Sequence, residues 1–389
     1  MTAPEATIPV DPLTLAIAAH ERAIALRAQT KLPAAETACR RAIAHYTRAA
    51  GPRSPDVANA LFELGQILEA RDRPRDARKA YVRARAILGK PPARPRDEGE
   101  ADVARLSIRV LMARAGVDRA LGAYAVAERG FHAALAETKR AFGPRDLDVA
   151  SLFNNLGVLR KYQGRFDEAV VFYKQALPML VAAAKRDGDT GPLATLYHNL
   201  GGIEHARGRY AAGEPWARKS VALREKAHGP DDVTVAADVA ALAALVEGRG
   251  RLDEAAALYV RAIAIFRRKL GPRSAEVALD LAGLASVRQA QGKLAEARRL
   301  YLRSLALQEH VFGKGHPEVA MTLNNFAALE RARGELARAE ALYARAYAVY
   351  REAVGPRHVH ARLTHANWRA VVDELEERQK KITKRGVRR

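Results

Sequence analysis

The sequence is poor in the residues that build disulfide-linked, secreted or membrane-spanning proteins. Its single cysteine, Cys39, excludes a disulfide within the chain and is consistent with a reducing compartment. No apolar run is long enough to span a bilayer. The N-terminal stretch MTAPEATIPVDP has neither the basic start nor the apolar core of a secretion signal. We therefore expect a cytoplasmic protein with no membrane span.

The chain also lacks the motifs of catalytic and metal sites. It contains no glycine-rich phosphate loop, no HExxH and no CxxC. His198 and His205 share a helix face, but no third ligand is evident, and metal sites need three or four convergent ligands. A second cluster near the C-terminus is an equally weak signal: His358, His360 and His365. We predict that the protein is not an enzyme and has no cofactor or metal.

Aromatic residues are scarce at 6%, although hydrophobic residues make up 49%, because alanine supplies much of the apolar content. Acidic residues are outnumbered 44 to 65 by basic ones, which gives a formal net charge of +21. This excess predicts an acidic partner, namely an acidic peptide, a nucleic acid or an anionic membrane. Alternatively, much of the charge only solvates the outer faces of helices.

What the chain does have is a repeated unit. In the stretch Gly313–Val354, apolar residues recur at helical spacing on both sides of Gly334. Gly334 can adopt the positive φ that ends one helix and lets the next begin. Neither helix can bury its apolar stripe alone, so each needs its partner and then the neighbouring helix pair.

The unit recurs eight times in register, most often at a step of 42 residues. Its reference positions, where each helix pair turns, are Thr30, Asp72, Gly122, Gly164, Gly208, Gly250, Gly292 and Gly334. Residues five and twelve places after the reference, and seven places before it, are always small, whereas the residue nine places after it is nearly always large. Small side chains let helix backbones approach, and the large ones fill the space beside them. Cys39 falls in the large column, so we expect a buried thiol rather than a nucleophile.

Small and large residues at these offsets resemble the tetratricopeptide repeat, whose usual length is 34 residues. The longer period, the GPRS-type joint and the Asn-Asn pairs in LFNNLG and LNNFAA are similar to the repeats of kinesin light chains and of bacterial proteins like them. The resemblance covers residues 11–375. It implies an all-α fold, a right-handed α-solenoid of stacked antiparallel helix pairs that binds peptides on its concave side.

The pattern predicts eight helix pairs and a cap. Residues 1–10 are predicted to be a disordered lead, residues 357–383 a C-terminal capping helix, and residues 384–389 a basic tail. The proline-rich stretch Gly89–Glu100 is predicted to be a loop, either a tolerated surface insertion or a hinge or partner-binding loop. The predicted helix pairs span residues 11–50, 55–88, 101–141, 147–186, 192–228, 232–270, 274–312 and 317–354.

The register also predicts which residues line a peptide-binding groove on the concave side. Asparagine is unfavourable inside a helix, which indicates that the Asn-Asn pairs bond something. Their amides can pair with the backbone of an extended peptide, while Lys161 and Arg331 hold its acidic side chains. Alternatively, the asparagines bond neighbouring helices and fix the superhelix. The predicted groove residues are Asn154, Asn155, Lys161, His198, Asn199, His205, Asn324, Asn325 and Arg331.

We therefore predict a non-catalytic protein–protein interaction scaffold that binds an acidic peptide or protein segment in its concave groove. The alternative is a nucleic-acid-associated protein that binds through its basic surfaces and its tail, RQKKITKRGVRR. Such a tail could equally contact anionic lipid or remain solvated. The identity of the partner does not follow from the residues.

Overall fold

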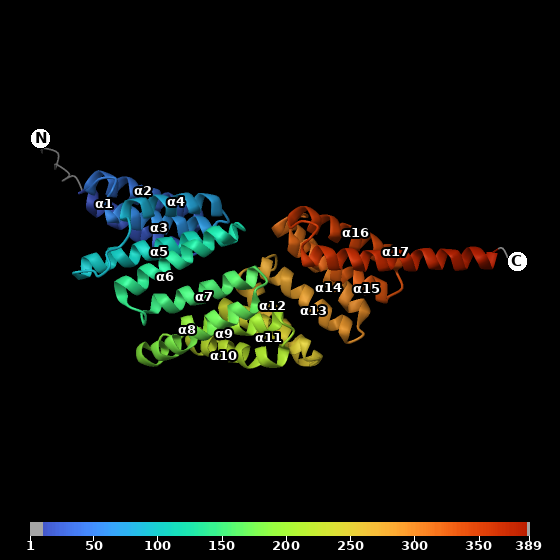
Figure 1. The fold of residues 1–389 in the computed structure, drawn as a ribbon. Coiled ribbons are helices and arrows are strands. Elements are labelled where there is room, and N and C mark those ends of the chain that lie inside the picture. The colour runs from blue at the N-terminus through green and yellow to red at the C-terminus, as the bar shows by residue number, and fades with distance from the viewer. Residues whose placement is uncertain (1–10, 387–389) are drawn as a thin grey trace, which may run out of the picture. The chain divides into compact units, whose positions relative to one another are not determined.

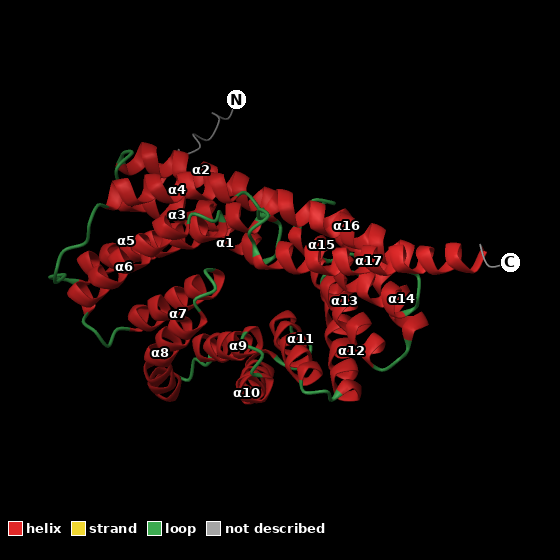
Figure 2. Ribbon diagram, turned by 45° about the vertical axis from the view of Figure 1, so that its right-hand side comes forward, coloured by secondary structure: helices red, strands yellow, loops and turns green. Residues whose placement is uncertain are grey.

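The computed structural model describes residues 11–386, and it describes side-chain surroundings for residues 11–381. This part of the chain is all-α: it forms 17 helices and no strand, as the sequence predicts (Figure 1, Figure 2). The predicted disordered lead, residues 1–10, and the last part of the predicted basic tail, residues 387–389, lie outside the described residues.

The helices fall into two units, each of which is described by itself. Unit 1 ends at Asp189 and unit 2 begins at Thr190, in a joint two residues longer than the usual one. In unit 1 the helices are α1 (Pro12–Ala28), α2 (Leu32–Ala50), α3 (Pro55–Ala70), α4 (Pro74–Leu88), α5 (Glu98–Ala120), α6 (Tyr124–Phe142), α7 (Leu147–Tyr162) and α8 (Phe166–Asp187). In unit 2 they are α9 (Gly191–Ala206), α10 (Tyr210–His228), α11 (Val233–Gly248), α12 (Leu252–Lys269), α13 (Ala275–Ala290), α14 (Leu294–Phe312), α15 (Pro317–Ala332), α16 (Leu336–Ala353) and α17 (Val359–Gly386).

Each helix pair turns at its reference position because that residue adopts a positive φ. All eight reference positions do so, and six of them are glycines, which enter this region without steric cost. Thr30, with φ 59°, and Asp72, with φ 55°, make the same turn with a side chain attached. A Cβ atom makes the left-handed conformation unfavourable, so the first two turns form at a conformational cost.

The joints between helix pairs combine a glycine with a capping side chain. Gly51 has φ 85° and Gly271 has φ 94°, values that end α2 and prevent α12 from continuing. The next helix then begins at a serine: Ser54 Oγ accepts from the Val57 amide at 3.3 Å, and Ser274 Oγ does the same for α13. The sequence motif Gly-Pro-Arg-Ser therefore encodes both the stop and the restart.

The predicted small and large columns are in contact inside the stack. The ring of Tyr81 lies against Gly65, and a Cβ atom on that glycine would be 2.2 Å from the ring. Cys39 takes the large position in the first pair and is fully buried, with its Sγ donating to the Ala60 carbonyl at 3.1 Å. Burial raises the pKa of the Cys39 thiol to about 12, so it stays protonated and unreactive at neutral pH.

Within each unit the odd-numbered helices form the tighter layer. Neighbouring odd-numbered helices contact each other; for example, α3 contacts α5 and α11 contacts α13. Among the described residues, neighbouring even-numbered helices have at most a marginal contact. In a curved stack of helix pairs the closer-packed layer lies on the inside of the curve. We call the solvent-facing side of the odd-numbered helices the inner face of each unit.

Two helices extend beyond their predicted bounds. α5 begins at Glu98, inside the stretch predicted as a loop, because Asp97 caps it by accepting from the Glu100 amide at 2.8 Å. α17 runs to Gly386 rather than to residue 383, so residues 384–386 of the predicted basic tail are helical.

α17 lies after the eighth pair, where the first helix of a ninth pair would stand. The indole Nε1 of Trp368 donates to Glu340 of α16 at 2.8 Å, and Val371 is buried beside it. Seven places before the reference, where all eight repeats have alanine or glycine, α17 has Arg369. The side chain of Arg369 is 58% exposed, so the outer side of the cap is polar.

Candidate protein-binding faces

The inner face presents five positions on each odd-numbered helix. They lie 13, 10, 9, 6 and 3 places before the reference, a spacing that puts them on one side of a helix. The predicted groove residues occupy three of these columns: the residues 10, 9 and 3 places before the reference. The two units present different chemistry in the five columns, and they are taken in turn.

The inner face of unit 1 carries three basic side chains on α5 and α7. Arg109 and Arg119 stand 13 and 3 places before the reference of their pair, and Lys161 stands 3 places before the next one. The guanidinium of Arg109 lies 5.2 Å from the centroid of the Phe62 ring, and that of Arg119 lies 5.0 Å from the centroid of the Tyr162 ring. None of the three has an ion-pair partner among the residues that the structure describes. We call Arg109, Arg119 and Lys161 the basic row.

Lys161 is the member of the basic row that the sequence predicts. Its side chain is half-buried, and burial alone lowers the pKa of its ammonium group. Asn154 lies seven residues earlier on the same face of α7, and Asn155 follows it; both are half-buried. An amide next to a partly desolvated ammonium can bind a carboxylate or a peptide carbonyl.

The carboxylates nearest to the basic row already have partners. Glu63 accepts from Arg27 Nε at 2.5 Å, and buried Asp118 accepts from Arg78 Nε at 2.6 Å. Glu69 accepts from the Tyr81 hydroxyl, and burial raises the pKa of this glutamate. Burial raises the pKa of Glu69 and of Asp148, and the charges of Arg119 and Arg109 partly offset this, but neither carboxylate forms an ion pair with the basic row among the described residues.

In unit 2, one predicted groove residue binds another helix of the stack. His198 of α9 places its Nδ1 2.7 Å from Oδ1 of Asp238 on α11. Asp238 is only 2% exposed and also forms an ion pair with Arg224, whose Nε is 2.8 Å from its Oδ2. His198 thus contributes to a buried polar cluster that joins two repeats.

Two further predicted groove residues, Asn324 and Arg331, are occupied by the capping helix. Oδ1 of Asn324 accepts from Thr364 at 3.3 Å and from Asn367 at 3.2 Å, both on α17. Arg331 forms an ion pair with Glu374 of α17, with its Nε 3.2 Å from the carboxylate. At this end of unit 2, Asn324 therefore bonds a neighbouring helix, which is the alternative interpretation of the asparagines.

The remaining predicted residues of unit 2 are partly exposed on the same face. Asn325 accepts from Asn324 Nδ2 at 3.2 Å. The ring of His205 lies 5.4 Å from that of Tyr210, and Asn199 is half-buried on α9. Whether these side chains contact a peptide stays a prediction.

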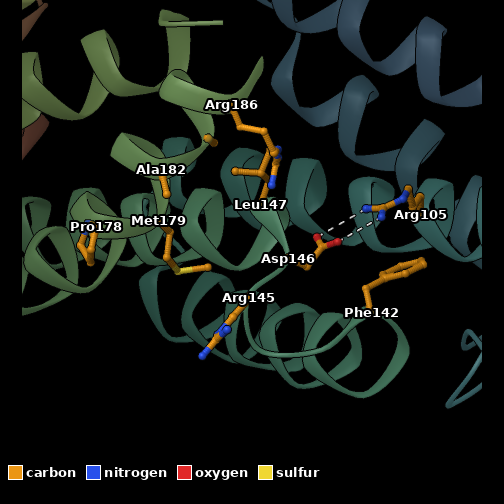
Figure 3. Close-up of a pocket in the computed structure, with 10 residues that line it drawn as sticks. Arg105, Phe142, Arg145, Asp146, Leu147, Pro178, Met179, Ala182 and Arg186 are labelled. Atoms are coloured by element: carbon orange, nitrogen blue, oxygen red, sulfur yellow. Dashed lines mark hydrogen bonds and ion pairs between the residues drawn. The ribbon is translucent and has the colours of Figure 1, made fainter. Parts of the chain in front are cut away.

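A separate cleft of about 760 Å³ lies in unit 1, beside the joint between α6 and α7. Figure 3 shows Arg105 beside Phe142, with its guanidinium joined to Asp146 at 3.0 Å. Arg186 on α8 is paired with Asp187 at 2.6 Å, so of the cleft's arginines Arg145 is the one with no carboxylate partner among the described residues. The lining of the cleft mixes polar and apolar side chains, and two of its three arginines are paired with carboxylates.

Basic residues are not distributed evenly over the helices. The odd-numbered helices α3, α9, α11, α13 and α15 each contain more acidic than basic residues. The even-numbered helices α2, α4, α6, α10, α12, α14 and α16 each contain more basic than acidic ones. The excess positive charge therefore lies mainly on the even-numbered helices. Among the odd-numbered ones, α1, α7 and α17 also contain more basic than acidic residues, and α5 contains equal numbers.

No group of three metal-ligating side chains is assembled among the described residues. Of the helices described, none combines the length and apolarity needed to cross a bilayer.

A family model described as tetratricopeptide repeat matches residues 14–90, 106–180, 192–268 and 273–352, which is well over half of the chain. The chain belongs to the tetratricopeptide repeat family. No curated protein matches the sequence significantly. Proteins of this family are generally non-catalytic scaffolds, and this chain is a protein-interaction scaffold of the helical-repeat class.

The chain is similar to several solved structures. BtubC (BKLC) from P. vanneervenii is 21% identical, with 65% of this chain and 94% of that chain covered and a TM-score of 0.45. A putative kinesin light chain of Podosopora anserina with nearly identical TPR-like repeats is 21% identical, covering 54% of this chain and 98% of that one at a TM-score of 0.42. A Rap protein complexed with competence and sporulation factor is 12% identical, with 93% and 98% covered and a TM-score of 0.51.

The sequence patterns identify some of these candidate residues and miss others. Arg119 stands in the same column as Lys161, so the register alone is enough to include it. Arg109 stands 13 places before its reference, a column that the asparagine pattern does not reveal. The partners of Arg331 and Asn324 could not be found without knowing how closely α17 packs against α15.

Proposed function

We propose that the inner face of unit 1 binds an acidic segment of a partner protein, with the basic row as its anchors. The observation that carries this proposal is the set of three basic side chains, Arg109, Arg119 and Lys161, without ion-pair partners among the described residues. A carboxylate that binds Lys161 would supply the counter-charge that burial makes favourable there.

The dimensions of the row fit a short extended segment. Arg109 and Arg119 are ten residues apart on α5, about 15 Å along the helix axis. About five residues of an extended chain cover that distance at roughly 3.3 Å each. Lys161 projects from the neighbouring odd-numbered helix, about 10 Å to the side at ordinary helix packing distances. Two or three acidic side chains in such a segment could therefore each reach a cation.

Asn155 would fix the direction of the bound segment. Its amide can donate to a peptide carbonyl and accept from a peptide amide at once. It has no side-chain partner among the described residues, and it is six residues before Lys161 on α7. The proposal thus keeps Asn154, Asn155 and Lys161 from the predicted groove and adds the two arginines of α5.

The test uses a fluorescein-labelled decaglutamate peptide and fluorescence anisotropy at low and moderate salt. The variant Arg109→Glu, Arg119→Glu, Lys161→Glu should bind the peptide at least about tenfold more weakly, a loss of about 1.4 kcal/mol. The matched control is Arg41→Glu, Arg83→Glu, Arg129→Glu, which makes the same charge change at exposed arginines on α2, α4 and α6. The control should bind within about threefold of the original chain. Equal losses in both variants, or no binding at all, would show that the inner face of unit 1 is not the site.

Association with nucleic acid is the second candidate function, and the basic even-numbered helices favour it. A surface that neutralises phosphates loses affinity steeply as salt rises. A labelled 20-base-pair duplex should then bind at low salt, and the Arg41→Glu, Arg83→Glu, Arg129→Glu variant should weaken it more than the basic-row variant does. Absence of binding at low salt would exclude this function.

A further inference from the structure

An open groove of about 500 Å³ lies between the two helices of the first pair, α1 and α2. Its lining residues on α1 stand 15, 12, 11, 8 and 4 places before the reference, a spacing that puts them on one stripe of the helix. They are Leu15, Ala18, Ala19, Arg22 and Leu26. We call this feature the first-pair groove.

In the eighth pair, the same stripe packs against the second helix of the pair before it. The Phe326 ring, 8 places before the reference, has its centroid 5.7 Å from that of the Tyr301 ring. Glu330, 4 places before the reference, accepts from Arg298 Nε at 2.9 Å. Tyr301 and Arg298 both belong to α14. A helix therefore fills, in the eighth pair, the place that is open in the first.

The exposure of the stripe differs in the same way. Leu15 is 40% exposed, and Leu13, Ile17 and Ile24 of α1 are exposed as well. The equivalents of Leu15 in the seven later repeats are all buried: Val57, Ser107, Val149, Leu193, Val235, Val277 and Val319. Stacking is what buries the apolar surface of each pair in an array, so an open apolar stripe is suited to a further helix.

The wall of the groove on α2 indicates which charge the covering helix carries. Its lining residues are Ala34, Thr37, Ala38, Arg41 and His45. Arg41 stands 11 places after the reference, as Arg261 and Arg345 do in later pairs. Arg261 pairs with Glu225 of α10 at 2.5 Å, and Arg345 pairs with Glu309 of α14. Both glutamates lie on the second helix of the preceding pair, so a helix over Arg41 should offer a carboxylate at the same place.

Arg22 brings a second positive charge into the groove. Its column contains leucine or phenylalanine in six of the later repeats and arginine in one, Arg114. Arg114 has Asp118 one turn away on its own helix, at 3.6 Å, whereas one turn from Arg22 stand Ala18 and Leu26. Neither arginine of the groove has an ion-pair partner among the described residues. None of the ten lining side chains, all among the described residues, carries a carboxyl group.

We propose that the first-pair groove binds an amphipathic helix of a partner protein, with apolar side chains against Leu15 and Leu26 and a glutamate or aspartate at Arg41 or Arg22. The bound helix takes the place beside α1 that α14 takes beside α15. From Leu15 to Leu26 the groove extends about 16 Å along α1, which corresponds to about three turns of a helix. Buried apolar side chains supply most of the affinity, and the charge-assisted pair fixes the direction of the helix.

A second copy of the chain suits the groove less well than an acidic helix does. A two-fold pairing of two such grooves would bring Arg22 and Arg41 of both copies into one interface, without a carboxylate among the lining side chains of either groove. Like charges brought together in an interface are unfavourable. The lining residues belong to α1 and α2, and the basic row belongs to α5 and α7, so the inference does not rest on the proposed function.

The test selects peptides of about 18 residues, long enough to form a helix, from a phage-displayed library on the full chain. Peptides that bind the variant Leu15→Glu, Ala18→Glu are removed first. This variant changes two exposed positions of the groove, and Ala18→Glu also gives Arg22 a carboxylate one turn away. Enriched peptides should have apolar residues three and four places apart and at least one glutamate or aspartate. Replacing that acidic residue with glutamine should weaken binding at least about tenfold.

Variants of the protein then locate the site. Arg22→Gln, Arg41→Gln should weaken the selected peptides at least about tenfold, whereas the matched control Arg129→Gln, Arg140→Gln, at exposed arginines of α6, should bind within about twofold of the original chain. The basic-row variant should bind these peptides normally, and decaglutamate should not compete, because it has no apolar face.

Three results would show that the proposal is wrong. The first is that no acidic amphipathic peptide is enriched. The second is that the Arg22→Gln, Arg41→Gln variant binds the enriched peptides normally. The third is that sedimentation shows a dimer that Leu15→Glu, Ala18→Glu dissociates, because a second copy would then occupy the groove.

Discussion

The ring of Tyr173 lies so close to Gly157 that a methyl group on that glycine would be 2.3 Å from the ring. Gly116, in the middle of α5, is different: apart from its chain neighbours and the backbone of its own helix, no atom is within 4 Å of the place where its Cβ would be. Both glycines are in helices, so the two positions separate the effect of close packing from the effect of glycine on the helix itself.

Replacing Gly157 with alanine should destabilise unit 1 by about 1–3 kcal/mol, because the added methyl group overpacks the Tyr173 ring. Gly116→Ala should instead stabilise it by about 0.5–1 kcal/mol, because alanine restricts the unfolded chain and favours the helix. Urea unfolding followed by circular dichroism measures both. Stabilisation by Gly157→Ala would contradict the contact between the small and large columns.

Substituting glycine for Thr30 or Asp72 should stabilise the first two repeats by about 1 kcal/mol each, because both residues hold a positive φ. The matched reverse substitution is Gly334→Ala, which should cost a similar amount in the eighth repeat. Melting temperatures of the three variants provide the comparison. A loss of stability in Thr30→Gly would mean that its hydroxyl, which donates to the Gln29 carbonyl at 2.7 Å, outweighs the strain.

Asp280 should make the stability of unit 2 fall as pH rises. Burial and the charge of Glu276 raise its folded-state pKa to about 8, whereas the pKa of an unfolded aspartate is about 4. The folded state therefore binds the extra proton between these values, and stability decreases from about pH 4 to about pH 8. Asp280→Asn should remove this decrease and be more stable by about 2–4 kcal/mol at pH 8. Identical pH profiles for the two proteins would show that the carboxyl group is solvated.

Glu128 should have the opposite pH dependence in unit 1. Hydrogen bonds from Arg160, at 2.8 and 2.6 Å, lower its folded-state pKa to about 2. The stabilisation is present above the unfolded pKa of about 4.3 and is lost as pH falls toward 2. Glu128→Gln should cost about 1–2 kcal/mol at pH 7 and much less at pH 2, as denaturant unfolding at the two pH values would show. A difference that is as large at pH 2 as at pH 7 would point to packing rather than charge.

Much of the fold could be predicted from the sequence because it repeats. A single small residue says little, but Ala297, Ala339 and their equivalents at one offset in eight repeats identify a helix–helix contact. Gly122 and Gly334 likewise identify turns, and the structure gives all the reference positions a positive φ. The turns at Thr30 and Asp72 could also be predicted, because the register puts both residues at reference positions, although neither residue favours a positive φ.

The candidate sites were less predictable because they depend on which partner a side chain finds. Lys161 and Arg331 stand in the same column, yet only Arg331 is paired, since α17 brings Glu374 to it. Asp238 and Asp280 also share a column, 12 places before the reference, but Asp238 contacts His198 and Arg224, whereas Oδ2 of Asp280 has no hydrogen-bond partner among the described residues. Their difference could be read from the sequence only by comparing the residues around them, and those residues are known to be neighbours only from the structure.

The exposed guanidinium of Arg369 determines where an array of this kind can grow. If a 42-residue repeat were duplicated and inserted before α17, each neighbouring repeat would have alanine or glycine at the position of Arg369. The new helix pair could therefore pack against the pair before it and the helix after it. A segment added after α17 would have to cover Arg369, whose side chain is 58% exposed and lies 3.6 Å from Asp373. Lengthening by duplication is therefore open to the interior repeats, and extension past the cap would first require Arg369→Ala.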